Sequence, residues 1–304
     1  MTAPVTRAGF IALAGRPNVG KSTLVNAIVG QKVAIVSDKP QTTRRAARGV
    51  ATGPDWQLIL VDLPGSQRPR DALTARMQAR VVRELGEADG ALLVVNGEQG
   101  VGPGDRFLAG LLRDAPVPLI VAVNKVDRLD RGARGGGDRV LLALEATEQL
   151  GLQGAEVFPV SARTGRGVGP LVEHLTGLLP ESPFLYEPGD VTDQPLTIEL
   201  AELVREQVLR RTFQEVPHSV EVVVEGIEEL RDGLLAVRAL IWVETESQKG
   251  ILIGAHGHMV KAVGTAARRE LQKILGTRVH LDLAVRVRRG WRADESLLDR
   301  LGIE

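Results

Sequence analysis

The chain contains no cysteine, and aromatic side chains make up only 3% of it. The lack of cysteine excludes disulfide scaffolds, iron–sulfur clusters, cysteine zinc sites and thiol nucleophiles, and it is consistent with a reducing compartment. The scarcity of aromatic residues argues against RNA-binding sheets of the RRM or OB type, which need stacking rings.

Long hydrophobic runs are also missing. The longest apolar stretches, Ala91–Val95 and Val117–Val123, are much shorter than the ~18 residues of a membrane-spanning helix. The first ten residues, MTAPVTRAGF, lack the apolar core of a signal peptide. We therefore expect a soluble, cytoplasmic protein. Its 304 residues suggest two domains of ~150 residues each.

The chain has no net charge, because 38 basic side chains balance 38 acidic ones, but the charges are unevenly distributed. Residues 181–248 carry 5 basic and 15 acidic side chains, whereas residues 249–292 carry 10 basic side chains and 2 acidic ones. Such a basic block is typical of phosphate binding, and it is equally typical of a solvated helix face. Charge alone leaves both interpretations open.

Nearly continuous apolar runs alternate with helix-length segments through residues 1–180, which predicts a doubly wound α/β domain with a mostly parallel sheet. The predicted strands are Phe10–Ala14, Leu58–Val61, Ala91–Asn96, Leu119–Asn124 and Val157–Val160. The glycine-rich stretch Arg131–Arg139 is expected to be a loop.

Residues 181–195 are rich in proline and lack periodicity, so we interpret them as a linker. The remaining residues, 196–304, predict a small α+β domain with the order α-β-β-α-α-β. Its expected elements are a helix at Ile198–Arg210, strands at Val220–Glu225 and Leu235–Glu244, a short helix ending at Gly254, a helix at His258–Leu275 and a strand at Arg278–Val287.

A phosphate-binding loop follows the first predicted strand directly. The pattern G-x-x-x-x-G-K-[ST] is matched by Gly15, Arg16, Pro17, Asn18, Val19, Gly20, Lys21 and Ser22, with Thr23 next. The two glycines let backbone N–H groups and a helix N-terminus face the phosphates. Lys21 can then reach the β- and γ-phosphates, and Ser22 can bind Mg²⁺. This pattern predicts a nucleoside triphosphate without identifying its base.

A second phosphate-facing motif follows the strand Leu58–Val61. It consists of Asp62, Leu63, Pro64 and Gly65. A carboxylate at this strand end can hold the water shell of Mg²⁺, and Gly65 can donate its N–H to a γ-phosphate.

Two further motifs indicate guanine. Asn124, Lys125 and Asp127 end the strand Leu119–Val123, at the sheet edge where α/β proteins bind ligands. A carboxylate there can accept both N1–H and the exocyclic amine of guanine, whereas adenine would leave the charge unmatched at a cost of ~1–3 kcal/mol. Ser161 and Ala162 follow the next strand, and the backbone N–H there can reach guanine O6.

In this order the motifs resemble those of translation-factor-related GTPases, and Gln41-Thr42-Thr43-Arg44 resembles the Era family in particular. The resemblance implies that Thr43 meets Mg²⁺ and the γ-phosphate together with Ser22 and Asp62, with Thr42 as the alternative. It places Lys21, Thr43, Asp62 and Gly65 in the catalytic set. Two residues depart from the usual pattern: Leu63 replaces threonine, and Ser66 stands where Ras-like enzymes carry a water-orienting glutamine. Serine is too short for that role, so intrinsic turnover is expected to be slow.

The basic block contains a second family signature, Gly254-Ala255-His256-Gly257, between two predicted helices. This setting resembles a type II KH domain, whose G-x-x-G loop clamps about four nucleotides of RNA. The expected RNA-binding residues are Lys249, Gly254, Ala255, His256, Gly257, Lys261 and Arg268. Era-like loops commonly carry lysine where this chain has Ala255-His256. His256 would then give RNA binding some pH dependence, or it would be an indifferent exposed imidazole.

Further resemblance to the Era family extends over Glu215–Ser219, Thr265–Arg268 and Gly290–Arg292, which brings nearly the whole chain into the comparison. It implies a GTP-hydrolysing switch that uses GTP, GDP and Mg²⁺, binds small-subunit ribosomal RNA rather than DNA, and acts in assembly of the small ribosomal subunit. Peripheral membrane contact stays open. The role of Asn18 also stays open. It either helps to hold a K⁺ ion or caps its own loop. The main alternative is an RNA-binding assembly factor in which hydrolysis is incidental; a P-loop kinase is disfavoured by Asn124–Asp127.

Overall fold

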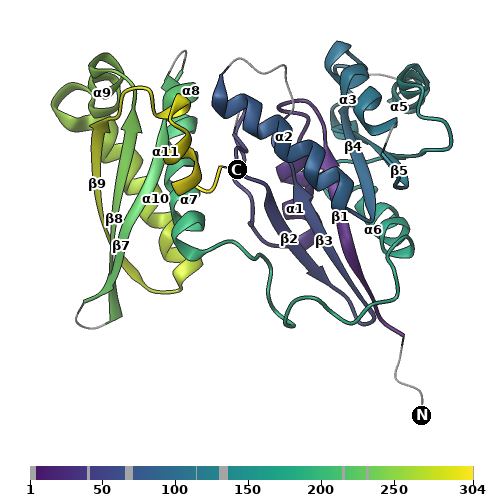
Figure 1. Ribbon diagram of the computed structural model, residues 1–304, viewed down its shortest axis with the longest axis horizontal. Helices are drawn as coiled ribbons and strands as arrows, with labels where there is room; N and C mark the ends of the chain where they lie inside the picture. The colour runs from purple at the N-terminus through teal and green to yellow at the C-terminus, as the bar shows by residue number, and fades with distance from the viewer. Residues whose placement is uncertain are drawn as a thin grey trace.

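The structure is a computed structural model that describes residues 5–39, 42–65, 71–113, 115–129, 136–213, 216–230 and 233–303. Two sheet-containing domains lie side by side, joined by a segment that runs along one end of the first (Figure 1). Within these described ranges, no helix is both long and apolar enough to cross a membrane.

In the part of the first domain that is described, six strands form one sheet in the order β2-β3-β1-β4-β5-β6. All neighbouring strands are parallel except β2 and β3, which confirms the predicted mostly parallel, doubly wound fold. The strands are β1 (Arg7–Ala14), β2 (Ala47–Thr52), β3 (Trp56–Asp62), β4 (Gly90–Asn96), β5 (Leu119–Asn124) and β6 (Glu156–Pro159).

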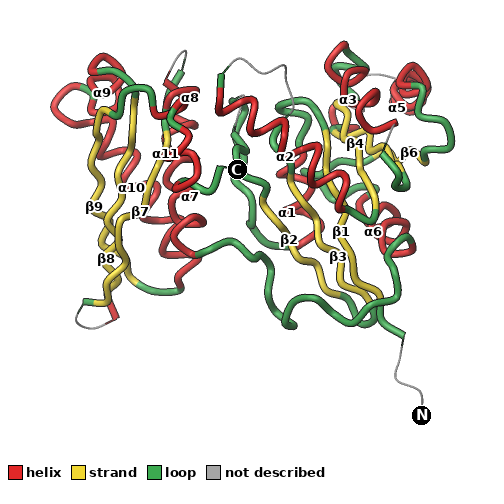
Figure 2. The backbone as a smooth tube through the Cα atoms, in the orientation of Figure 1, coloured by secondary structure: helices red, strands yellow, loops and turns green. Residues whose placement is uncertain are grey.

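Helices cover both faces of this sheet (Figure 2). Alternate side chains of β1 show why: Ile11 and Leu13 pack in one apolar core with α1 and α6, whereas Ala12 packs in the other core with α2 and α3. The helices of this domain are α1 (Lys21–Val29), α2 (Ala72–Glu87), α3 (Pro103–Arg113), α4 (Val126–Leu129), α5 (Gly136–Glu145), the 3₁₀ helix η1 (Ala146–Leu150) and α6 (Val168–Gly177).

Two features of this domain differ from the sequence prediction. Strand β2 was not predicted, because Arg48 and Gly49 interrupt its apolar pattern; it is held by its antiparallel pairing with β3. The expected loop Arg131–Arg139 was wrong for its last residues, since α5 begins at Gly136. Strong helix formers from Leu141 to Glu145 extend the helix back over the glycines, because helix propagation is cooperative. Residues 131–135 lie outside the described residues.

The second domain confirms the predicted order α-β-β-α-α-β. Its sheet has the order β7-β8-β9, with β7 antiparallel and β9 parallel to β8. Helices α7 and α10 pack on one face over a single apolar core. The elements are α7 (Leu196–Arg211), α8 (Val216–Ser219), β7 (Glu221–Glu229), β8 (Leu234–Val243), α9 (Glu246–Ile253), η3 (Ala255–Gly257), α10 (His258–Leu275), β9 (Arg278–Val287), η4 (Trp291–Ala293) and α11 (Glu295–Arg300). The short helices α8 and α11 were not predicted.

The segment predicted as a linker, residues 181–195, packs against the first sheet. Val50 N donates to Val191 O at 2.8 Å, and the Gln57 side chain accepts hydrogen bonds from the backbone N–H groups of Leu185 and Tyr186 at 2.8 and 2.9 Å. Because Gln57 is fully buried, these bonds fix the path of the segment.

A small apolar core joins the two domains. Leu73 and Met77 of α2 pack with Trp291 and with Leu297 and Leu298 of α11. Trp291 is fully buried, and its indole N–H donates to Ser219 O at 3.0 Å. The C-terminal segment therefore fastens the second domain to α2 of the first.

We expect Trp291→Ala to lower the free energy of unfolding by about 3–5 kcal/mol, the usual cost of truncating a buried tryptophan. Leu142→Ala is the control, because Leu142 is 62% exposed and its truncation should cost less than about 0.5 kcal/mol. Urea unfolding followed by far-UV circular dichroism measures both. Equal midpoints for the two variants would contradict the role given to Trp291.

Candidate functional site

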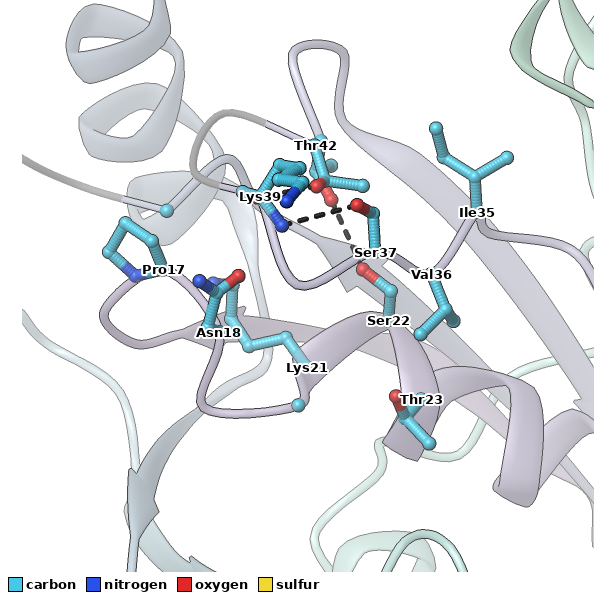
Figure 3. A pocket seen from close by; sticks show the side chains of 13 residues that line it. Pro17, Asn18, Lys21, Ser22, Thr23, Ile35, Val36, Ser37, Lys39 and Thr42 are labelled. Carbon is cyan, nitrogen blue, oxygen red and sulfur yellow. Dashed lines mark hydrogen bonds between the residues drawn. The ribbon is translucent and has the colours of Figure 1, made fainter. Parts of the chain in front are cut away.

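A cleft opens at the carboxyl edge of the first sheet, beside the loop between β1 and α1 (Figure 3). Its walls come from this loop, from the segment that follows α1 and from Gly65. The lining residues are Pro17, Asn18, Gly20, Lys21, Ser22, Thr23, Ile35, Val36, Ser37, Lys39, Thr42, Thr43 and Gly65.

The backbone of the β1–α1 loop requires glycine at both ends. Gly20 has φ 102°, and a Cβ there would lie 2.4 Å from Asn124 Nδ2. A Cβ on Gly15 would lie 2.6 Å from the Val94 carbonyl oxygen. The predicted glycines thus let the loop curl against the ends of β4 and β5, with the N-terminus of α1 facing the cleft.

Lys21 lies at the base of the loop. Its Nζ donates to Gly15 O at 3.0 Å and to Arg16 O at 3.3 Å, so the side chain is drawn across the loop. Burial lowers the pKa of Lys21, while the negative charge of Asp62 acts to raise it. The ammonium is therefore held in a poorly solvated position, where a further anion would stabilise it.

Three oxygen-bearing side chains meet beside Lys21. Asp62 Oδ2 accepts from Ser22 Oγ at 2.6 Å and from Thr43 Oγ1 at 3.3 Å, and the two hydroxyls lie 3.1 Å apart. These residues come from β3, α1 and the segment before β2, so the fold brings together three positions far apart in the sequence.

This donor set fits Mg²⁺. Asp62 is fully buried, and its Oδ1 has no hydrogen-bond partner among the described residues. Burial raises the pKa of Asp62, while Lys21, Ser22 and Thr43 act to lower it. A buried carboxylate oxygen without a partner, next to two hydroxyls, matches the preference of Mg²⁺ for hard oxygen ligands shared with phosphates and water.

The two neighbouring threonines face different groups. Thr43 reaches Ser22 and Asp62, whereas the Thr42 hydroxyl donates to Lys39 O at 2.6 Å. The structure therefore places Thr43 with the candidate metal ligands. Gly65 lies against the loop, since a Cβ there would meet Pro17 at 3.0 Å. Gln41, Glu215 and Ser66 lie outside the described residues.

Asn124 connects three of the predicted motifs. Its Nδ2 donates to Val19 O at 2.9 Å, and its Oδ1 accepts from Lys125 N at 2.8 Å and from Ala162 N at 3.0 Å. The Ala162 amide, expected to face guanine O6, is thus used to join the ends of β5 and β6. Lys125 Nζ in turn donates to Asn18 O at 2.6 Å.

Asp127 has a donor on each carboxylate oxygen. Ser161 Oγ donates to Oδ1 at 2.7 Å, and Arg163 Nη2 donates to Oδ2 at 2.5 Å. Burial acts to raise the pKa of Asp127, but the bonds from Ser161 and Arg163 outweigh it and lower this pKa. Sequence reasoning missed Arg163; its position next to Ser161–Ala162 was the available signal.

A second candidate site lies in the other domain, at the turn between α9 and α10. Gly254 and Gly257 both have positive φ, 69° and 75°, and His256 has φ 51°. A Cβ on Gly254 would lie 2.9 Å from Met259 Cβ, whereas Gly257 has open space around it. The loop therefore exposes backbone at the N-terminus of α10, the arrangement that suits phosphate.

A separate groove lies between α10 and β9; we call it the KH groove. It contains the predicted residues Lys261 and Arg268, which are exposed. It also contains Thr265 of α10 and His280 and Asp282 of β9, which were not predicted as ligands. The alternation of polar and apolar residues in Arg278–Val287 was the sequence signal that could have identified the latter two. Lys249 of α9 and the loop residues Gly254, Ala255, His256 and Gly257 do not line this groove.

Comparison with known families matches both domains. Residues 10–125 match the family described as "50S ribosome-binding GTPase", and residues 215–292 match the family "KH domain". The chain is also similar in structure to Era in complex with MgGDPNP and nucleotides 1506–1542 of 16S ribosomal RNA, with a TM-score of 0.92, 34% identity, and coverage of 98% of this chain and 99% of that one.

A point variant of Era from Aquifex aeolicus, bound to GDP·AlF4⁻, gives a TM-score of 0.91 at 33% identity, with the same coverage. Among curated relatives, GTPase Era of Mycobacterium avium is 45% identical over 300 residues, which is 97% of this chain and 98% of the relative. GTPase Era of Mycobacterium tuberculosis H37Rv is 44% identical over 299 residues, with the same coverage. Since the similarity extends over both domains and nearly their full length, the chain belongs to the Era family of GTPases.

Proposed function

We propose that this chain hydrolyses GTP at the β1–α1 cleft, binds small-subunit ribosomal RNA at the KH groove, and acts in assembly of the small ribosomal subunit in the cytoplasm. The observation that carries the proposal is the meeting of Ser22, Thr43 and Asp62 beside Lys21, in a chain whose second domain presents a G-x-x-G loop. The Era relatives support the same pairing of activities.

The loop residues bind and orient the phosphates. Backbone N–H groups between Gly15 and Ser22 and the ammonium of Lys21 face the β- and γ-phosphates, where charge develops in phosphoryl transfer. Ser22, Thr43 and Asp62 would hold Mg²⁺, which neutralises charge on the phosphate oxygens when it is bound. The Gly65 amide, held against Pro17, is placed to donate to the γ-phosphate.

The small-subunit assignment follows the Era complex, because its RNA is a segment of 16S ribosomal RNA. The family matched by residues 10–125 is described instead by 50S binding, but that match covers the GTPase domain alone. The KH domain is the part expected to contact RNA, so we give the Era complex more weight.

K⁺ is a further proposed cofactor. The Asn18 side chain donates to Asp38 O at 2.6 Å, so it bridges the phosphate-binding loop to the segment after α1 rather than serving that loop alone. Asn18 has φ 65° and lines the cleft. The Asn18 amide oxygen and the Asp38 carbonyl oxygen would be suitable ligands for a monovalent cation placed between the β- and γ-phosphates.

We expect Asp127→Asn to shift nucleotide preference from GTP towards xanthosine triphosphate. The amide reverses the hydrogen-bonding requirement at the exocyclic position of the base, and one mismatched bond costs roughly 10- to 100-fold in affinity. Competition binding against both triphosphates measures the change. Undiminished GTP preference in the variant would show that the base pocket is assigned wrongly.

We expect ribosomal RNA to bind the KH groove and to accelerate single-turnover GTP hydrolysis, and Gly257→Asp to abolish both effects. The aspartate would repel phosphate and strain a position with φ 75°. The probe is an RNA equivalent to nucleotides 1506–1542 of 16S ribosomal RNA, with affinity measured at several salt concentrations.

Gly276→Asp is the matched control, because Gly276 has φ 63°, open space around it and a place in the same domain beyond the groove. RNA affinity retained by Gly257→Asp would show that the loop between α9 and α10 is not part of the binding site. A hydrolysis rate unchanged by bound RNA would favour the alternative in which hydrolysis is incidental.

We expect GTP turnover to be faster in K⁺ than in Na⁺ at constant ionic strength, and Asn18→Ala to remove the difference. The reason is that a cation held between the β- and γ-phosphates offsets the charge that arises there. Equal wild-type rates in the two salts would eliminate the cation.

A further inference from the structure

The segment that contributes Thr43 to the GTPase cleft is held by the KH domain at both ends. We call residues 32–45 the switch segment; all but residues 40–41 are described. At its start, Lys32 pairs with Glu206 of α7 at 2.6 Å and with Glu270 of α10 at 3.5 Å. Glu206 also accepts from Val36 N at 3.0 Å, so a fully buried carboxylate fixes this end.

At its other end, Arg44 is inserted into the KH domain. Its side chain is fully buried, and Nη1 lies 2.8 Å from Oε2 of the equally buried Glu221. The same guanidinium donates to Val220 O at 2.5 Å and to His218 O at 3.0 Å, and it lies over the ring of Trp291.

The nearby residues Thr42 and Arg45 also contact the KH domain. Arg45 pairs with Glu202 at 2.6 Å and with Glu221 at 3.3 Å, and Arg205 of α7 donates to the Thr42 carbonyl oxygen. Thr42, Arg44 and Arg45 thus all bind the KH domain, whereas Thr43 faces Ser22 and Asp62.

We infer that Arg44 and Glu221 form a positioning pair for GTP hydrolysis: the KH domain, besides binding RNA, sets the place of the Thr43 hydroxyl at the metal site. Arg44 touches no substrate. It acts because Thr43 is its neighbour in the chain, and a shift of Arg44 would carry that hydroxyl away from Asp62. This inference rests on the proposed GTP and Mg²⁺ site.

Loss of the pair should have a specific effect on nucleotide binding, because the resemblance to the Era family implies that Thr43 contacts the γ-phosphate and Mg²⁺. GDP lacks the γ-phosphate, so loss of the pair is expected to affect GTP and leave GDP affinity nearly unchanged. A role confined to holding the domains together would not separate the two nucleotides.

The test uses the full chain with Arg44→Gln, Glu221→Gln and the double variant, which removes both charges of the pair. Each single variant is expected to slow single-turnover hydrolysis about tenfold and to raise the Mg²⁺ concentration needed for half-maximal rate, a coupling of ordinary size between sites. The double variant should lose less than the sum of the two single losses, because both substitutions remove the contact between Arg44 and Glu221.

Arg76→Gln is the matched control, since Arg76 pairs with Glu295 and Asp299 of α11 in the same domain interface but away from the switch segment. The inference is overturned if Arg44→Gln behaves as Arg76→Gln does, if GDP affinity falls as much as GTP affinity, or if the losses in the double variant add. Wild-type protein that neither binds nor hydrolyses GTP would instead refute the proposed function.

Discussion

The buried ion pair between Arg44 and Glu221 joins the segment that carries Thr43 to the KH domain. Both side chains are fully withdrawn from water, and burial lowers the pKa of Arg44 to about 10 even with Glu221 beside it. Desolvating two charges is expensive, and removing one partner of such a pair typically costs about 3–5 kcal/mol. The pair therefore favours one relative placement of the domains, the one in which arginine and glutamate meet.

The same principle acts inside the GTPase cleft. Lys21 and Asp62 are both buried. Burial lowers the pKa of Lys21 and raises the pKa of Asp62, so it favours the neutral form of each side chain. Their mutual attraction opposes those shifts, and so do the hydroxyls of Ser22 and Thr43 on Asp62. Phosphate and Mg²⁺ would supply the missing counter-charges, so the cleft is organised in advance for the groups it is proposed to bind.

The sequence predicted the fold class because the apolar runs that form the buried strands can be recognised locally. Continuous apolar runs identified the buried parallel strands, and the loop beginning at Gly15 needs its glycines for backbone reasons alone. Strand β2 was not predicted, because it depends on pairing with β3 rather than on an apolar pattern in its own residues. The contacts of Arg44 were not predicted either, for a related reason. Within the sequence it is one arginine beside a threonine pair, and its partner Glu221 lies 177 residues away.

The interface between domains was the largest feature that no local pattern could indicate. A proline-rich stretch predicted a linker between two separate cores, but Leu73 and Met77 share a core with Trp291, and residues 181–195 pack on the first sheet. The surfaces that meet are unremarkable in sequence, since α2 alternates apolar and basic residues as any amphipathic helix does.

The two sets of basic residues in this chain also respond differently to salt. Lys261 and Arg268 are exposed, so their attraction for RNA phosphate is screened within about 8 Å at physiological ionic strength. Arg44 and Arg205 are buried, so ions cannot reach the contacts that they make between the switch segment and the KH domain. We therefore expect rising salt to lower the affinity for RNA and to leave the contacts between the switch segment and the KH domain in place. The contacts that join the switch segment to the KH domain therefore differ from the expected RNA contacts both in burial and in their sensitivity to salt.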